Sequence, residues 1–280
     1  VIIFMKKNIF FLWLFLNSLY AFCQYTGTNQ AINNGNMRFG DEFELSINTS
    51  GNFKQPFYKN IEGVWRQLTY TDERVPPVIP YALDSSIGVG GVGATTWNRD
   101  GDIESNPVMA GQAFDSSGFS GGSGIIKVKG NITVGLAQLE LINSLSIGRE
   151  DNFIEVTTTF KNIGAAAIIN LRYWIGTRDD YVGDTDSRAS DSPTKVRGNL
   201  VSGAFQPLTL PTERSSALRI TSPDEGILFF TLASNANNSH AGFNWDDNLS
   251  EELDPDLASV SSTIDGSYSM YVRMNDLAIN

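Results

Sequence analysis

The chain has 280 residues, of which 41% are hydrophobic and 11% aromatic, a composition that suits a packed core and not a disordered protein. Its formal net charge is −11, which disfavours nucleic acid and anionic membrane surfaces as partners because both attract basic patches. One histidine and one cysteine leave zinc without its usual ligands and leave the chain without an internal disulfide.

The first element in chain order is a signal peptide over residues 1–23, with upstream read-through before Met5. Lys6 and Lys7 form a basic start, and residues 9–16 form an apolar core that is shorter than the roughly 20 residues needed to span a bilayer. Cleavage is expected at or near Gln24, which leaves no membrane span. The mature protein is therefore expected to be secreted or held on the outer cell surface.

Cys23 leaves a second form of processing open. A lipoprotein would carry its acyl group on this residue, although the bulky Phe22 stands where a small residue is wanted. Residues 24–35 are expected to form a flexible N-terminal segment, and residues 36–280 a single β-sandwich domain. Because a strong strand pattern lies so close to Asn280, we expect the natural product to continue beyond it.

Period-two alternation of apolar residues predicts most of the mature chain to be strands. The predicted strands cover residues 43–48, 64–70, 125–128, 136–145, 153–161, 168–176, 217–221, 226–233 and 267–274. At least eight strands with few helices indicate an all-β fold, either a large antiparallel β-sandwich or a super-sandwich. Residues 75–124, 179–199 and 235–262 are predicted to be long irregular loops, either functional or poorly ordered.

Two glycine-rich motifs resemble catalytic or cofactor-binding signatures but lack the structural context these require. Residues 88–93 (GVGGVG) have a dinucleotide-binding spacing, but no helical pattern follows them. Residues 118–122 (GFSGG) match a nucleophile elbow, but the only available base is His240, in a polar run predicted as loop. The first motif is therefore predicted to be a glycine-rich loop, and no serine triad is expected at the second.

Acidic residues in the predicted loops are candidates for a calcium site, because a hard cation prefers oxygen ligands. The metal candidates are Asp179, Asp180, Asp184 and Asp186, and further acidic runs lie at residues 98–104 and 246–256. The alternative is that these acids are ordinary solvated turn residues.

Aromatic residues beside the same loops are candidates for a glycan platform, because sugar faces stack on rings. The ligand-binding candidates are Trp97, Trp174, Tyr181 and Trp245, with Arg178 beside them. The alternative is that the rings close the ends of the sandwich core, since aromatic side chains provide much of the apolar burial in proteins.

Residues 170–183 (NLRYWIGTRDDYVG) resemble a segment from the N-terminal region of large, adhesin-like secreted or surface proteins of bacteria that export cargo across an outer membrane. Residues 193–199 and 271–277 extend this resemblance, which covers about the last half of the chain. No activity is assigned to that region. The resemblance implies a non-catalytic surface module that binds a glycan or a surface protein.

A weaker resemblance is to the galactose-mutarotase-like super-sandwich of sugar epimerases and polysaccharide lyases. It rests on residues 44–47, 65–70, 153–162 and 169–175. The epimerases carry an active-site histidine after the central strand, whereas this chain has Tyr173, Trp174 and then Arg178 there. A carbohydrate-active enzyme is therefore the alternative to the binding module, and fold likeness alone does not carry the activity.

Overall fold

The computed structural model describes residues 37–39, 56–67, 71–72, 79–80, 84–90, 92–97, 110–177, 182, 193–222, 226–232, 239–242, 259–264 and 268–279. Within these ranges strands make up 61% of the residues and none is helical, so the all-β class predicted from the sequence is confirmed. The same ranges contain no helix long and apolar enough to cross a membrane. The signal peptide, the 24–35 segment and the predicted strand at residues 43–48 lie outside them.

Four long antiparallel strands form one layer of the molecule, which we call the long-strand sheet. In spatial order it contains β11 (Glu155–Asn162), β10 (Ala137–Ile147), β9 (Ser123–Val134) and β8 (Ala110–Ser120). Alternate residues of β10 are buried. Val156, Thr158 and Phe160 of β11, and Ile154 just before it, point inward as the sequence pattern predicts. One face of this sheet therefore forms the core.

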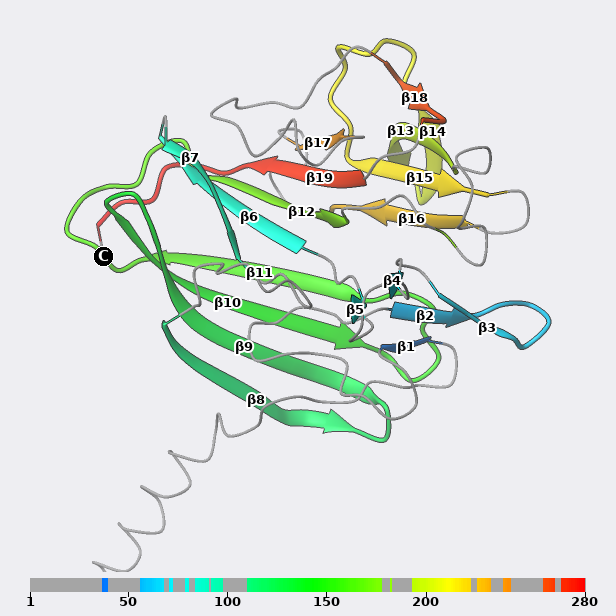
Figure 1. The fold of residues 1–280 in the computed structure, drawn as a ribbon, viewed down its shortest axis with the longest axis horizontal. Coiled ribbons are helices and arrows are strands. Elements are labelled where there is room, and N and C mark those ends of the chain that lie inside the picture. The colour runs from blue at the N-terminus through cyan, green and yellow to red at the C-terminus, as the bar shows by residue number, and fades with distance from the viewer. Residues whose placement is uncertain are drawn as a thin grey trace, which may run out of the picture.

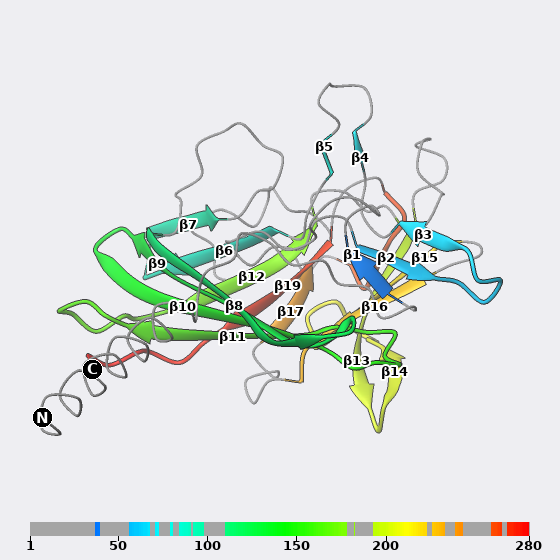
Figure 2. The ribbon, with the colours of Figure 1, turned by 90° about the horizontal axis from the view of Figure 1, so that it is seen from below.

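The second layer, the central sheet, brings together strands that lie far apart in the sequence. Its spatial order is β17 (Ser239–Gly242), β19 (Tyr268–Arg273), β12 (Arg172–Thr177), β6 (Asp84–Val89) and β7 (Val92–Trp97). Figures 1 and 2 show this sheet stacked on the long-strand sheet. The arrangement is a β-sandwich of antiparallel sheets.

The core lies between these two sheets. Leu139 and Leu141 of β10 pack with Ile87 of β6, and all three are 0% exposed. Tyr173 of β12 crosses the interface, where its ring meets Phe160 edge-to-face at 5.3 Å. Its hydroxyl oxygen accepts a hydrogen bond of 3.2 Å from Thr158 Oγ1. The inward face of the central sheet is therefore fixed by Tyr173, and its neighbours along β12 lie on the opposite face.

A third sheet, the lateral sheet, packs beside the central sheet. It contains β14 (Ala204–Pro207), β13 (Thr194–Val201), β15 (Ala217–Thr221) and β16 (Gly226–Phe230) in that order, and β18 (Ser261–Ser262) pairs with β13. Leu218 and Ile220 of β15 pack with Tyr268 and Met270 of β19 in a second buried cluster. The lateral sheet thus shares its buried face with the central sheet.

Two smaller sheets complete the described structure. One contains β1 (Met37–Phe39), β2 (Pro56–Lys59) and β3 (Trp65–Gln67), and the other pairs β4 (Thr71–Asp72) with β5 (Ile79–Pro80). Tyr58 of β2 packs against the main core. The sheet of β1, β2 and β3 therefore covers part of the sandwich.

The three stretches predicted to be irregular loops contain strands, so those predictions are wrong in part. Residues 75–124 contain β5, β6, β7 and β8, residues 179–199 contain most of β13, and residues 235–262 contain β17 and β18. His240 accordingly lies in a strand instead of a loop.

Both glycine-rich motifs lie at β-hairpin turns, where strands and not an irregular loop flank each turn. Ser120 pairs with Ser123 across Gly121 and Gly122, whose φ angles of 61° and 83° suit a tight two-residue turn between twisted strands. In the other motif, β6 leads through a turn at Gly90 into β7. Neither turn leads into a helix, so the context that a nucleotide site or a nucleophile elbow requires is absent at both motifs.

Candidate functional site

The sequence-predicted site residues fall into two groups. Trp174 lies in β12 and Trp97 in β7, and for both the structure describes the strand position without the side chain. Arg178, Tyr181 and Trp245 lie outside the described residues, as do the metal candidates Asp179, Asp180, Asp184 and Asp186. Among the residues that are described, no three His, Cys, Asp or Glu side chains gather as a metal site would require.

The register of the central sheet gathers aromatic and polar residues on the face that points away from the sandwich core, which we call the distal face. Trp174 stands directly opposite Tyr271 of β19 and Ser86 of β6, and His240 of β17 stands opposite Tyr271 on its other side. Directly opposed residues share one face of a sheet. His240, Tyr271 and Trp174 therefore form one row across three strands.

Two arginines form the next row on the same face. Arg172 stands opposite Arg273 on one side and Gly88 on the other. A Cβ atom added at Gly88 would overlap the guanidinium of Arg172, with Nε at 2.6 Å and Cζ at 2.8 Å. The Arg172 guanidinium therefore lies flat over the backbone of β6, and a glycine is needed there to make room for it. Two guanidinium-bearing residues therefore stand opposite each other on this face.

A buried hydroxyl lies in the row on the other side of Tyr271, away from the arginines. Ser269 is 0% exposed, and its Oγ has no hydrogen-bond partner within the described part of the chain. It stands between Gly176 and Gly242, and Gly176 packs so closely that an added Cβ would lie 2.6 Å from the Ser269 Cβ. A small residue is therefore required at Gly176, on one side of this row.

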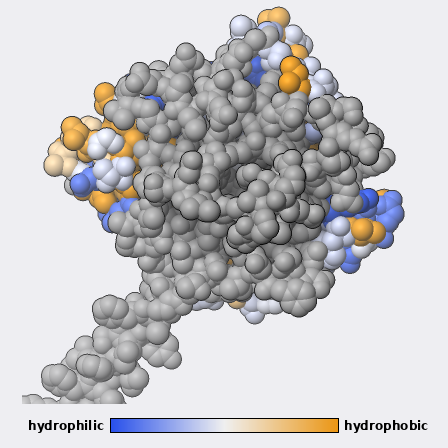
Figure 3. All heavy atoms as spheres, in the orientation of Figure 1, coloured by the Kyte–Doolittle hydropathy of each residue, from blue (hydrophilic) through white to orange (hydrophobic). Residues whose placement is uncertain are grey.

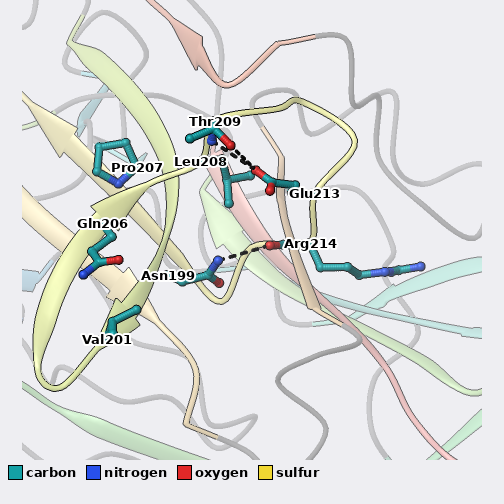
Figure 4. Close-up of a pocket in the computed structure, with 8 residues that line it drawn as sticks. All are labelled: Asn199, Val201, Gln206, Pro207, Leu208, Thr209, Glu213 and Arg214. Carbon is teal, nitrogen blue, oxygen red and sulfur yellow. Dashed lines mark hydrogen bonds between the residues drawn. The ribbon is translucent and has the colours of Figure 1, made fainter.

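A second candidate is a depression of about 290 Å³ on the lateral sheet (Figure 4). Its lining residues come from β13, β14 and the segment that follows β14: Asn199, Val201, Gln206, Pro207, Leu208, Thr209, Glu213 and Arg214. In Figure 4 the Arg214 side chain points away from the other lining residues, so its charge lies outside the depression.

Most of the polar groups in this depression already bind within the protein. Glu213 Oε2 accepts hydrogen bonds from the Leu210 N–H at 2.9 Å, the Thr209 N–H at 3.0 Å and the Thr209 hydroxyl at 3.2 Å. These bonds, with the Leu210 amide first, hold the pKa of Glu213 below its ordinary value of 4.5. Asn199 Oδ1 accepts from the N–H and hydroxyl of Ser216 at 2.9 and 3.0 Å. The depression is thus the surface of a loop that is closed by its own hydrogen bonds.

A third surface is apolar and lies at the end of the sandwich where β9 turns into β10 and β11 connects to β12. Leu136 is 100% exposed there and Ile169 54%, and Figure 3 shows apolar side chains gathered at the corresponding margin of the molecule. Ile163, which donates its N–H to Gln138 O, is 40% exposed beside them. Since Leu and Ile side chains form no hydrogen bonds, this surface does not suit a glycan.

Of the three surfaces, the distal face is the one that combines aromatic residues with arginines. Trp174 was identified from its place beside a predicted loop, whereas Tyr271, Arg273 and His240 were missed as site residues. In the sequence, Tyr271 and Arg273 belong to an alternating strand pattern and His240 to a polar run. Neither pattern shows which strands are neighbours in the sheet. A scan of protein-family models and searches of curated proteins and of solved structures found no match to this chain.

Proposed function

We propose that the chain is a non-catalytic binding module, exported from the cell, that holds a glycan on the distal face of its central sheet. The observation that carries this proposal is the row of His240, Tyr271 and Trp174 beside the paired Arg172 and Arg273. Rings offer flat apolar faces with polar edges, and guanidinium groups bind carboxylates through a planar fork of donors. The array therefore suits a glycan with acidic groups. Export agrees with the basic and apolar N-terminal pattern.

A binding module is favoured over an enzyme because, among the described strand positions of this face, the carboxylate residue and the histidine stand far apart. Asp84 lies on the same face as His240, but two strands separate β6 from β17. At about 4.8 Å per strand the two backbones are about 14 Å apart. A catalytic acid and base must each reach one sugar atom at about 3 Å.

The second candidate function is a carbohydrate-active enzyme of the super-sandwich type. The observation that favours it is that the only histidine of the chain lies on the same sheet face as two arginines. A positioned histidine is the commonest general acid or base in catalysis. In that case His240 would act on a sugar held between Tyr271 and Trp174.

The test is a glycan array that contains neutral and acidic glycans, followed by affinity measurement on the glycans that bind. We expect Tyr271→Ala and Arg273→Ala each to weaken binding about tenfold or more, because buried Tyr and Arg contacts dominate binding energies. Trp65→Ala in β3 and Arg219→Ala in β15 are the matched controls and should bind as the wild type does.

Two results would contradict the binding module. Equal affinities for all four variants would show that the glycan does not bind at the distal face. Chemical modification of the glycan, seen in NMR spectra, would indicate an enzyme. Loss of that product in His240→Ala would then assign the reaction to the second candidate.

A further inference from the structure

The last strand of the lateral sheet, β16, has one side of its backbone turned away from its only neighbour in the described structure, β15. The Thr231 N–H donates to Ser216 O at 2.9 Å, which directs the backbone of Thr231 toward β15. Successive residues of an antiparallel strand alternate in direction. Gly226, Leu228 and Phe230 therefore turn both their N–H and C=O groups outward.

The side chains of this edge are apolar and exposed. Leu228 is 40% exposed, Phe230 39% and Leu232, just beyond the strand, 78%. The strand GILFF contains no charged residue and no proline. Soluble proteins usually protect an edge strand with charges, proline or a bulge, because an open edge pairs with other chains. β16 has neither a charge nor a proline, so it is suited to pairing.

The sequence of β16 complements itself when two copies run antiparallel about Leu228. In that register Leu228 faces Leu228 of the second copy, and Phe230 of each copy faces Gly226 of the other. All three outward-turned residues then oppose outward-turned residues, so each facing pair exchanges two hydrogen bonds. A shift by one residue would set outward groups against inward ones and lose these bonds.

A phenylalanine ring that lies over a glycine is already present in this sheet. Phe205 stands opposite Leu200, and its ring reaches diagonally over Gly198 of the adjacent strand, where an added Cβ would meet ring atoms at 2.5 and 2.6 Å. The Arg219 guanidinium stacks on the same ring at 4.8 Å from its centroid. A neighbouring glycine leaves room for a ring on the sheet, and Gly226 would leave the same room for Phe230 of the second copy.

From this geometry we propose that two copies of the chain pair through β16, joining their lateral sheets into one continuous sheet across a two-fold axis. A second copy fits better than an unrelated strand because the same five residues supply both halves of the complementary pattern. The chain carries a net charge of −11, so two copies repel each other in general. β16 is a neutral strip at which they can approach.

The size of the contact determines its strength. Five paired residues with the side chains of Leu228, Phe230 and Leu232 bury well under the roughly 1,600 Å² of a standard stable interface. The dimer should therefore be weak and dissociate on dilution. On a cell surface, where copies are held close together, such contacts gain from the raised effective concentration.

The register is tested by disulfide trapping in the full exported chain with Cys23→Ser, which removes the only natural cysteine. Leu228→Cys sets two cysteines directly opposite each other across the axis, at the roughly 5.5 Å Cα separation of a hydrogen-bonded pair, which a disulfide can bridge. We expect it to form a covalent dimer at least tenfold faster than Ile61→Cys, whose position is 98% exposed in the β2–β3 hairpin. Equal rates would overturn the proposal.

Sedimentation equilibrium tests the contact without cross-linking. Across micromolar to millimolar concentration the average mass should rise from monomer toward dimer, and Leu228→Lys should raise the dissociation constant at least tenfold. Val201→Lys is the matched control, since Val201 is 46% exposed on the same sheet away from β16, and it should leave the constant unchanged. A mass that stays monomeric throughout, or equal constants for the two variants, would overturn the proposal.

Discussion

At the scale of single residues, two fully buried cations distinguish the lateral sheet. Lys195 and Arg197 are both 0% exposed, and alternation along β13 places them on the face shared with Leu218 and Ile220. Lys195 Nζ donates to Ile264 O at 2.7 Å. The Arg197 guanidinium donates to the backbone oxygens of Pro211, Glu213 and Ser259 at 2.8, 2.9 and 3.1 Å. Both side chains therefore tie irregular segments to a strand.

Replacing Arg197 with methionine should strongly destabilise the protein. The change keeps much of the side-chain volume but leaves three carbonyl oxygens without their donor, each at a cost of about 1–3 kcal/mol when buried. We expect the free energy of unfolding in urea to fall by about 3 kcal/mol or more. Arg219→Met, at an exposed position, should cost about 1 kcal/mol or less. Similar losses for both variants would show that Arg197 does not hold the loop.

Glu213 should make stability depend on pH in the acidic range. Its folded-state pKa is lowered from 4.5 by the backbone N–H groups of Leu210 and Thr209. Its stabilisation is therefore fully present above 4.5 and is lost as the pH falls through the folded pKa. In thermal melts from pH 3 to 7, the difference between wild type and Glu213→Gln should shrink at the acid end. Glu155→Gln, on an exposed face of β11, is the control and should show a smaller change.

At the scale of elements, strands with strict alternation were predictable from the sequence. β10, β11, β12, β15, β16 and β19 lie within or close to the predicted ranges because each has one apolar face against the core. The strand at β15 has the predicted limits, residues 217–221. In these segments burial of a single face fixes both the period and the strand.

The strands that the sequence pattern did not predict are stabilised by pairing with neighbouring strands, because their own residues do not favour a strand. β6 contains only Ile87 and Val89 as apolar core residues, and β8 is rich in glycine and serine. Glycine and other small polar residues have low strand propensity. β6 and β8 form strands because their backbones pair with β12 and β9. In β13 the buried positions hold Lys195 and Arg197, which period-two reasoning reads as polar and exposed.

The sequence could predict a candidate site residue on a single strand, but it could not predict which residues of other strands lie beside it. Trp174 could be identified beside a loop, but its neighbours on the distal face come from β19 and β17, about a hundred and about seventy residues further along the chain. The pairing of strands so distant is not fixed by local alternation. A single sequence therefore does not show which site residues are brought together by the pairing of distant strands.

At the scale of the whole molecule, the fold must be stable despite an excess of negative charge, and a single cysteine cannot form an internal disulfide. Loss of Lys6 and Lys7 with the signal peptide would change the net charge from −11 to −13. The described sheets bury cations at β13 and pair arginines on the distal face, so part of the positive charge is held at fixed positions. The acidic residues predicted to bind calcium lie outside the described residues, and their role stays a prediction.

Calcium should stabilise the protein if Asp179, Asp180, Asp184 and Asp186 share one ion. Crowded carboxylates disfavour one another's ionised form, and a divalent ion with oxygen ligands relieves that repulsion. At a free concentration a hundredfold above the dissociation constant, linkage adds about 2.7 kcal/mol to the free energy of unfolding. The double variant Asp184→Asn with Asp186→Asn should lose this increment, whereas Glu62→Gln with Glu155→Gln removes the same charge and should keep it. Identical melting temperatures in calcium and in chelator would mean that these carboxylates are separately solvated, and the sandwich would then rest on its cores and buried cations alone.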